Sequence, residues 1–140
     1  MSLTISSPPV VVDASVAVDF LAEPDDDLDL RWRRWTDEGR LLIAPPYLWA
    51  EVANGLLRGR RLAAPVVTGM LDDFEASGIS TADRGAAGVR ASVELAAEHG
   101  LTVYDASYLW LAIDIDGELA TRDKALIRAA RAEGVALALD

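Results

Sequence analysis

The sequence predicts an α/β fold in which a mainly parallel sheet of short strands is covered by helices on both faces. Short runs of β-branched or aliphatic residues alternate along the chain with longer segments whose apolar residues recur at helical spacing. Strands that alternate with helices pair in parallel and are buried on both sides. With 140 residues, of which 51% are hydrophobic, the chain is expected to form a single domain over residues 1–140.

The elements of the first half are marked by residue type and by stop signals. Three consecutive valines predict a buried strand that runs directly into a helix. Pro45 and Pro46 end the second strand and preset φ for the first turn of the next helix. The expected elements are a strand at 10–12, a helix at 15–21, a helix through 32 and 35 that ends at 39, a strand at 41–44 and a helix at 47–57, closed by residues 58–61.

The second half continues this alternation. Gly100 and Gly134 are placed to end helices, because glycine adopts the left-handed conformation of a helix C-cap at little cost. The expected elements are helices at 64–76 and 85–98, separated by a segment at 78–81 that could form a short strand, then a helix at 102–113, a strand at 118–121, a helix at 123–132 and a final strand at 135–139.

Composition excludes several kinds of site. A formal net charge of -10 and a pI near 4.4 count against a nucleic-acid binder built on clustered Lys and Arg, although a bound metal can reverse the charge locally. Without cysteine, the chain has neither a disulfide framework nor a thiolate metal site. His99 is the only histidine, which disfavours most zinc sites, and we interpret it as a helix C-terminal cation or a surface residue.

Targeting signals are absent from the sequence pattern. No apolar run approaches the ~20 residues that cross a bilayer. The N-terminal segment MSLTISSPP lacks the basic start and the apolar core of a signal peptide. We therefore expect no membrane association and a cytoplasmic location.

Four acids stand at positions that packing alone does not explain. Asp13 follows the first strand, Asp123 follows the strand at 118–121, Glu51 lies inside an apolar helix, and Asp105 opens another helix. Parallel sheets bind ligands outside the carboxyl ends of their strands, so these acids are expected to converge there, Asp105 provided that a short strand or turn precedes its helix. Carboxylate oxygens suit hard cations, and the pattern predicts a cage for Mg²⁺ or Mn²⁺.

Helix capping is a competing explanation for three of these acids. Asp13, or Ser15 in its place, could cap the helix that follows. Asp105 stands three residues after Thr102, which is the spacing of a capping box. Asp123 stands at a helix start, where an acid suits the helix dipole.

Glu51 has no such explanation. Its neighbours on both sides are apolar, and an unpaired buried carboxylate is costly, so either an arginine or a metal is expected to compensate it. Arg58 stands seven residues further on, which places it ~10 Å along the helix axis and disfavours an ion pair within the helix. With three other acids expected nearby, the metal is the favoured explanation.

Four segments around these acids together resemble a known family. They are VVVDASVAV at 10–18, APPYLWAEVAN at 44–54, YDASYL at 104–109 and LATRD at 119–123. In order and spacing, across residues 10–139, they resemble PIN-domain ribonucleases, and most closely the VapC toxins of VapBC toxin–antitoxin pairs. The resemblance implies a PIN-like three-layer fold, with core metal-binding acids and small hydroxyl residues that orient them or a bound water. The acids are Asp13, Glu51, Asp105 and Asp123, and the hydroxyl residues are Ser15 and Thr121.

The resemblance also implies an activity and partners. The activity is endonucleolytic cleavage of RNA that leaves a 5′-phosphate and a 3′-hydroxyl. The partners are a second copy in a homodimer and a VapB antitoxin whose basic side chain reaches the acids, which the net negative charge would suit. A metal cage agrees with this chemistry, because the cation would activate water and stabilise the leaving oxygen without a protein nucleophile.

One departure from the family lies in the first helix. Asp19-Phe20 stands where the family often has a lysine followed by an aromatic residue. The change leaves the four acids intact. It puts the substrate preference in doubt.

An RNA backbone needs cations that the overall charge does not suggest. Arg58, Arg60 and Arg61 follow the Glu51 helix, and Arg122 and Lys124 flank Asp123, so these residues could line a path for phosphates. Equally, the first three could simply suit a helix C-terminus or a solvated face. The four tryptophans are interpreted as core or interface residues in preference to base-stacking platforms; they are Trp32, Trp35, Trp49 and Trp110.

Three other hypotheses remain open from the sequence. A housekeeping RNA-processing PIN nuclease would differ from a toxin chiefly in its partner. A non-catalytic interaction domain could keep the fold, although retention of all four acids argues against it. A phosphoryl-transfer domain of the receiver or haloacid-dehalogenase type would also place Asp13 at a strand end. The dehalogenase hypothesis is disfavoured because position 15 is a serine where a second aspartate is required.

Overall fold

The computed structural model describes residues 7–140, so the first six residues of the predicted domain lie outside the described part. The elements are β1 (Val10–Val12), α1 (Ala14–Ala22), α2 (Asp26–Asp37), β2 (Leu42–Ala44), α3 (Leu48–Asn54), the π-helical turn η1 (Gly55–Gly59), α4 (Ala64–Ala76), β3 (Ser80–Thr81), α5 (Gly85–His99), α6 (Val103–Asp114), β4 (Glu118–Ala120) and α7 (Lys124–Ala132).

The strands form one four-stranded sheet in the order β3-β2-β1-β4. All neighbouring strands are parallel, and Val10 of the central strand β1 lies opposite Leu42 of β2 and Glu118 of β4. The chain extends the sheet in one direction from β1 to β3 and then returns to place β4 on the other side of β1. Such a reversal creates a crevice for ligands at the carboxyl ends of the two strands that flank it, here β1 and β4.

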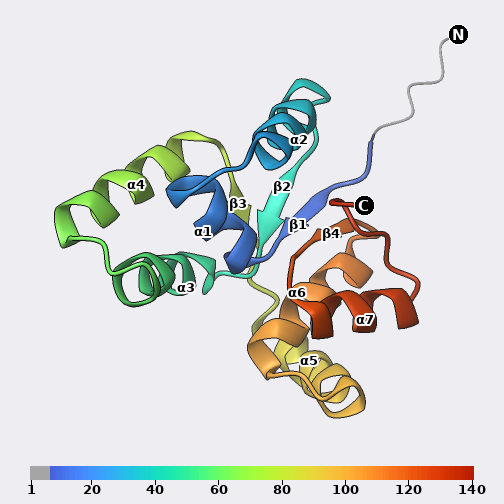
Figure 1. Cartoon of the computed structure of the whole chain (residues 1–140). Helices are drawn as coiled ribbons and strands as arrows, with labels where there is room; N and C mark the ends of the chain where they lie inside the picture. The colour runs from blue at the N-terminus through green and yellow to red at the C-terminus, as the bar shows by residue number, and fades with distance from the viewer. Residues whose placement is uncertain (1–6) are drawn as a thin grey trace, which may run out of the picture.

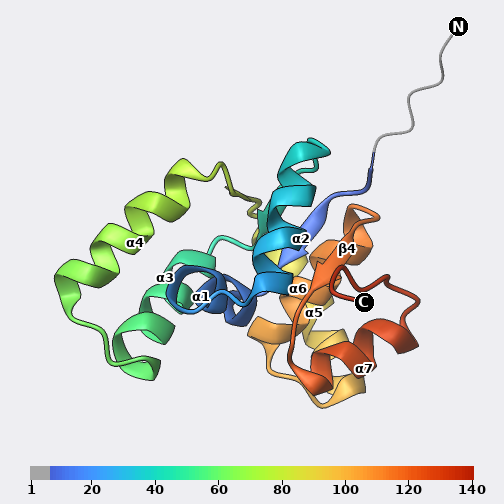
Figure 2. The same ribbon diagram turned by 45° about the horizontal axis from the view of Figure 1, so that its top comes forward.

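Helices cover the sheet from both sides. Figures 1 and 2 show α1, α3 and α4 gathered on one side of the strands, and α5, α6 and α7 on the other. Helix α6 packs on β1, and α5 packs along α6. The predicted α/β fold with a parallel, doubly covered sheet is therefore confirmed. No helix within residues 7–140 is long and apolar enough to cross a membrane.

The core contains the three valines of β1, each with an exposed fraction of 0%. Trp32 stacks on Phe20 with ring centroids 3.9 Å apart, and this contact ties α2 to α1. Trp32 and Trp35 are buried, while Trp49 and Trp110 are partly buried against the core. The interpretation of the tryptophans as packing residues agrees with these positions.

The last predicted strand, at 135–139, is wrong. Within the described residues this segment forms only an isolated parallel bridge between Leu137 and Leu119. The N–H of Val135 donates to Ala130 O at 2.8 Å and closes the end of α7. Pairing with β4 is limited to Leu119, whose N–H donates to Ala136 O and whose carbonyl oxygen accepts from the N–H of Ala138, both at 2.9 Å. A β-branched and aliphatic composition could not reveal that the pairing with β4 would stop after a single bridge.

The segment before Asp105 contains a turn and no strand. Helix α5 ends at His99, and Gly100 adopts φ +67°, as its predicted role as a C-cap requires. Two residues then lead directly into α6. The condition placed on Asp105, a short strand or a turn before its helix, is met by the turn.

The helix predicted at 47–57 is divided into α3 and the π-helical turn η1. At the junction, a Cβ on Gly55 would lie 2.8 Å from Cγ2 of Val18, so only glycine permits this close approach of α3 to α1. Single π turns often occur at functional sites. Here the turn leads into Arg60, whose N–H donates to Gly55 O at 2.9 Å.

Candidate metal centre

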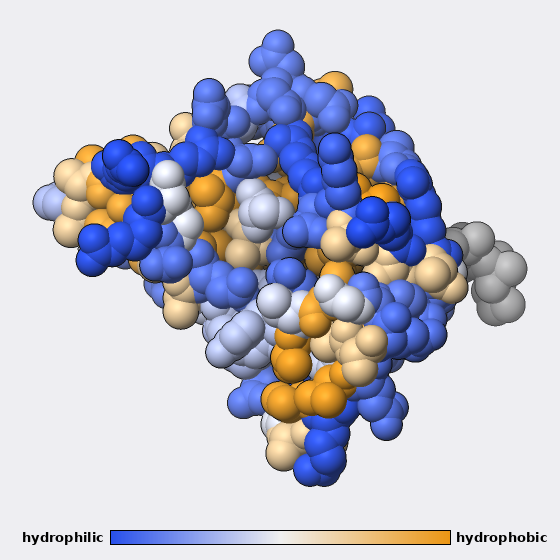
Figure 3. Space-filling view, turned by 60° about the horizontal axis from the view of Figure 1, so that its bottom comes forward, coloured by the Kyte–Doolittle hydropathy of each residue, from blue (hydrophilic) through white to orange (hydrophobic). Residues whose placement is uncertain are grey.

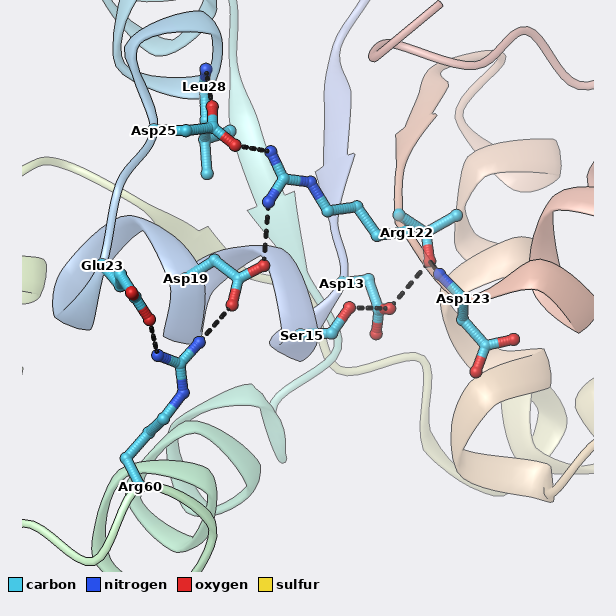
Figure 4. Close-up of polar contacts among 10 residues, drawn as sticks. Asp13, Ser15, Asp19, Glu23, Asp25, Leu28, Arg60, Arg122 and Asp123 are labelled. Atoms are coloured by element: carbon cyan, nitrogen blue, oxygen red, sulfur yellow. Dashed lines mark hydrogen bonds and ion pairs between the residues drawn. The ribbon is translucent and has the colours of Figure 1, made fainter.

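Asp13 is held where the sheet reverses. The register pairs Val12 with Ala120, and the N–H of Asp13 donates to Ala120 O at 3.0 Å, so Asp13 and Thr121 leave the sheet side by side. The hydroxyls of Thr121 and Ser15 donate to the same oxygen, Oδ2 of Asp13, at 2.9 and 2.8 Å (Figure 4). Asp13 is buried, with an exposed fraction of 5%.

Glu51 projects from α3 and is half-buried, with a partner that the sequence did not suggest. The hydroxyl of Tyr108 donates to Oε1 of Glu51 at 2.9 Å. Tyr108 lies in α6 one turn after Asp105 and is fully buried. The expectation that an arginine or a metal must compensate Glu51 was therefore incomplete, because a tyrosine supplies part of the compensation.

Asp105 and Asp123 stand at the beginnings of α6 and α7. Thr102 caps α6 by accepting a hydrogen bond from the N–H of Asp105 at 3.1 Å. Asp123 caps α7 through Oδ1, which accepts from the N–H of Leu126 at 2.9 Å. Oδ2 of Asp123 takes no part in that bond and is available to a ligand.

Capping accounts for these acids unequally. Asp13 occupies the N-cap position of α1, but its side chain makes no capping hydrogen bond. Ser15 does not cap either, since its hydroxyl is directed at Asp13. The capping explanation is thus correct for Asp123 and wrong for Asp13, whose burial needs another cause. For the Thr102–Asp105 pair it is correct only for Thr102, which caps α6 by accepting from the N–H of Asp105.

The acids influence one another through their charges. Burial raises the pKa of Asp13, the hydroxyls of Ser15 and Thr121 lower it, and the charge of Asp105 raises it further. Burial and the charges of Asp13 and Asp105 raise the pKa of Glu51 against the lowering effect of Tyr108. Burial and the charge of Asp123 likewise raise the pKa of Asp105, which the hydrogen bond with Thr102 opposes. Acids from four separate segments therefore influence one another, and no cation is among the causes of these three pKa shifts.

The donor set fits a hard divalent cation. It consists of carboxylate and hydroxyl oxygens, and a cation would offset the repulsion that raises these pKa values. Within the described residues, no three of the four acids bring ligand oxygens within 4.8 Å of one another. A Mg²⁺ ion bound among these acids would therefore need waters or substrate phosphates to complete its coordination.

A different cluster does meet that spacing. Glu98, His99 and Glu133 bring ligand atoms within 4.8 Å of one another, at the ends of α5 and α7. Nε2 of His99 lies 3.6 Å from Oε1 of Glu133, and the His99 side chain is only 14% exposed. His99 thus ends a helix, as interpreted from the sequence, but it is largely buried and not a surface residue.

Ion pairs that the sequence analysis missed border the acids. Asp19 binds Arg60 and Arg122, Arg60 also binds Glu23, and Arg122 also binds Asp25 (Figure 4). The departure at position 19 could have signalled this arrangement, because an aspartate in place of a lysine forms ion pairs with arginines and not with acids. The partners themselves lie far away in the sequence.

An open depression lies beside Glu51. It measures about 350 Å³, and its lining includes Ser15, Asp19, Glu51 and Arg60. Figure 3 turns the lower side of Figure 1 toward the viewer; most of this face is hydrophilic, with hydrophobic residues in its lower part and also at its left edge. The depression offers room for a ligand next to Glu51.

Residues 10–132 match the family model for the PIN domain. The chain belongs to the PIN domain family. The matched region contains all four acids of the candidate centre, together with Ser15 and Thr121. A comparison with curated protein sequences finds no match.

Solved structures with this PIN fold include three that cover most of the chain. PAE2754 from Pyrobaculum aerophilum is 22% identical with a TM-score of 0.68, covering 89% of this chain and 82% of that one. VapC20 from Mycobacterium tuberculosis, a toxin that cleaves the sarcin-ricin loop, is 14% identical with a TM-score of 0.67, covering 86% and 94%. VapBC2 from Rickettsia felis, bound to a DNA fragment from its promoter, is 18% identical with a TM-score of 0.67, covering 85% and 91%. At these identities the likeness supports the fold.

Proposed function

We propose that this PIN domain is a metal-dependent endoribonuclease that hydrolyses phosphodiester bonds of RNA, and that it is the toxin of a type II toxin–antitoxin pair. The observation that carries the proposal is the state of Asp13. This carboxylate is buried where the sheet reverses, accepts two hydroxyl hydrogen bonds on one oxygen, and has its pKa raised by burial and by Asp105. A buried carboxyl group with a raised pKa is typical of a functional site.

Asp13, Glu51, Asp105 and Asp123 are the proposed metal-binding residues, with Mg²⁺ or Mn²⁺ as the cofactor. When bound, the cation supplies an activated water and stabilises charge on the phosphate. The protein itself orients the acids. Ser15 and Thr121 orient Asp13 through Oδ2, Tyr108 orients Glu51 through Oε1, and the cap of α7 directs Asp123.

Cleavage is proposed to leave a 5′-phosphate and a 3′-hydroxyl, as the resemblance to PIN-domain ribonucleases implies, with water as the nucleophile that attacks the phosphate. We further propose that residues 1–140 form a single PIN domain and that the protein acts in the cytoplasm, where RNA is available. The family match over residues 10–132 supports the first point.

A VapB-type antitoxin and a second copy of the chain are the proposed partners. The similar structures include the VapC20 toxin and the VapBC2 complex, and this likeness supports an antitoxin partner. The net charge of -10 suits a basic inhibitor peptide. Co-purification with a small basic protein and light scattering of the isolated chain test the two partners.

The nuclease proposal is tested by cleavage of end-labelled single-stranded RNA with Mg²⁺, Mn²⁺ or EDTA. Asp13→Asn keeps the shape of the side chain and is expected to abolish cutting. Asp114→Asn, which removes an acid at the far end of α6 from Asp105, serves as the control and is expected to cut normally. Equal cutting by all three proteins, or cutting that persists in EDTA, contradicts the proposal. Mapping of the product ends checks the 5′-phosphate.

A further inference from the structure

Asp19 is the centre of a chain of ion pairs at the edge of the acid site. Its two carboxylate oxygens bind different arginines: Oδ1 binds Nη2 of Arg60, and Oδ2 binds Nη1 of Arg122 at 3.0 Å. The outer ends of the network are closed by Glu23, 2.7 Å from Arg60, and by Asp25, 2.8 Å from Arg122. Figure 4 shows Asp19 between the two guanidinium groups.

Both arginines lie next to residues of the candidate metal centre. Arg122 stands between Thr121, which binds Asp13, and Asp123, which caps α7. Arg60 lines the same open depression as Ser15 and Glu51. Figure 4 shows the Arg122 side chain running from the backbone next to Asp123 toward Asp19, so both guanidinium groups lie at the α1 edge of the centre. A nucleic-acid strand that crosses this edge would bring its phosphates to them.

The network is built so that a phosphate can displace Asp19. The exposed fractions of the Asp19, Arg60 and Arg122 side chains are 25%, 32% and 37%, so each pair is reached by solvent and is weak. A guanidinium binds a phosphate through the same two-pronged geometry that it uses for a carboxylate. Three carboxylates surround two guanidinium groups, which leaves the network with a net charge of about -1 and no free cation.

We propose that Asp19 sets the affinity of the site for RNA by occupying Arg60 and Arg122, the two cations placed to bind backbone phosphates beside the acids. This inference rests on the proposed nuclease function and names a determinant of its substrate selection. A strand must displace Asp19 before it gains these phosphate contacts. The displacement costs the same free energy for every strand, so RNA binds tightly only when further contacts offset that cost.

The test is binding of fluorescein-labelled single-stranded RNA, followed by anisotropy in Mg²⁺ with Asp105→Asn present throughout to prevent cutting. Introducing Asp19→Asn into this background is expected to lower the Kd for RNA by at least about threefold, since each exposed ion pair is worth up to roughly fivefold in an equilibrium constant. The salt dependence is expected to steepen by about 1.4 in the slope of log K against log salt, from two new phosphate contacts on a single strand.

Two comparisons separate released arginines from a general change of charge. Arg60→Gln with Arg122→Gln should abolish the gain produced by Asp19→Asn. Asp114→Asn also removes one acid and releases one arginine, Arg84, but at the far end of α6 from Asp105, and should change binding by less than about twofold.

Each outcome decides the inference. It is overturned if Asp19→Asn weakens binding or leaves it unchanged, or if the gain survives loss of both arginines. Should Asp19→Asn fail to fold, Glu23→Gln is the second variant: this residue is 80% exposed and holds Arg60 from the other side, and its change should tighten binding by a smaller factor. The proposed nuclease function is overturned by a different result, namely that Asp13→Asn cuts RNA as well as the parent does. If Asp13→Asn abolishes cutting but Asp19→Asn does not tighten RNA binding, only the role of Asp19 is overturned.

Discussion

Tyr108→Phe removes one oxygen from the core and leaves the ring in place. That oxygen donates to Oε1 of Glu51 at 2.9 Å, between α6 and α3. Tyr108 has an exposed fraction of 0%, so water cannot easily replace the lost donor. The variant therefore tests whether this hydroxyl orients Glu51 for a metal.

The expected size of the effect follows from the geometry. A hydrogen bond to a charged group contributes about 1.5–3 kcal/mol, and loss of a residue that supports a metal ligand lowers metal affinity by about 10–100-fold. We expect a loss of about tenfold in Mg²⁺ affinity, because Glu51 is one of several proposed ligands. The pKa of Glu51 is expected to rise further, since the Tyr108 hydroxyl now acts to lower it.

The assay is thermal unfolding at a series of Mg²⁺ concentrations. Binding to the folded state raises its stability by RT ln(1 + [L]/Kd), so a weaker site moves the onset of the rise in Tm to higher Mg²⁺. The Mg²⁺ dependence of RNA cleavage, measured on the same variants, should shift by the same factor. The two readouts together separate weaker metal binding from a general loss of stability.

Tyr104→Phe is the matched control, because it removes the same group from a side chain that is 61% exposed in the same helix. It should leave the Mg²⁺ dependence unchanged. Our reasoning about Glu51 is refuted if Tyr108→Phe folds normally and responds to Mg²⁺ as the parent does.

Two further predictions concern packing and pH. Gly55→Ala would place a Cβ 2.8 Å from Cγ2 of Val18 and should lower the free energy of unfolding in urea by about 1–3 kcal/mol. Gly59→Ala is the control, because a Cβ there would have nothing within 4 Å, and it should have little effect. Equal stability of the two variants would contradict the close approach of Gly55 to Val18. Burial raises the pKa of Asp13 above its value in the unfolded chain, so without metal the folded state binds a proton at this carboxyl more tightly than the unfolded chain does. In EDTA, the free energy of unfolding of the parent, relative to that of Asp13→Asn, should therefore fall as the pH rises from about 4 through the raised pKa. A difference between those two proteins that does not vary with pH in unfolding experiments would refute the raised pKa.

Local pattern was sufficient for most of the elements. The three valines of β1 and the apolar spacing of the helices are properties of a few neighbouring residues, and the structure has elements at those places. The pattern failed at 135–139, where the end of α7 takes the N–H of Val135 and the segment pairs with β4 through one bridge only. It also could not distinguish an α-helix from the π turn at Gly55, because that turn accompanies the close packing against Val18.

The candidate site divides in the same way. Asp13, Glu51, Asp105 and Asp123 could be named from the sequence, because acids after strands or inside apolar helices are unusual for their surroundings. Their supporting contacts could not, since they join residues distant in the chain: Tyr108 and Glu51 are 57 residues apart, and Thr121 and Asp13 are 108 apart. Such pairs are formed by helix packing and strand register, which no local pattern specifies.

By itself, the sequence determined the α/β class, the family resemblance and the identity of the acids, because periodicity and residue chemistry are legible over short stretches. Only the tertiary structure decided that Asp13 is held by two hydroxyls and does not cap α1, that Glu51 has a tyrosine partner, and that Asp19 occupies two arginines beside the acids. The physical reason is that hydrogen bonds and ion pairs depend on distances of a few ångströms, and those distances are set by the order of the strands in the sheet and by the packing of the helices on it.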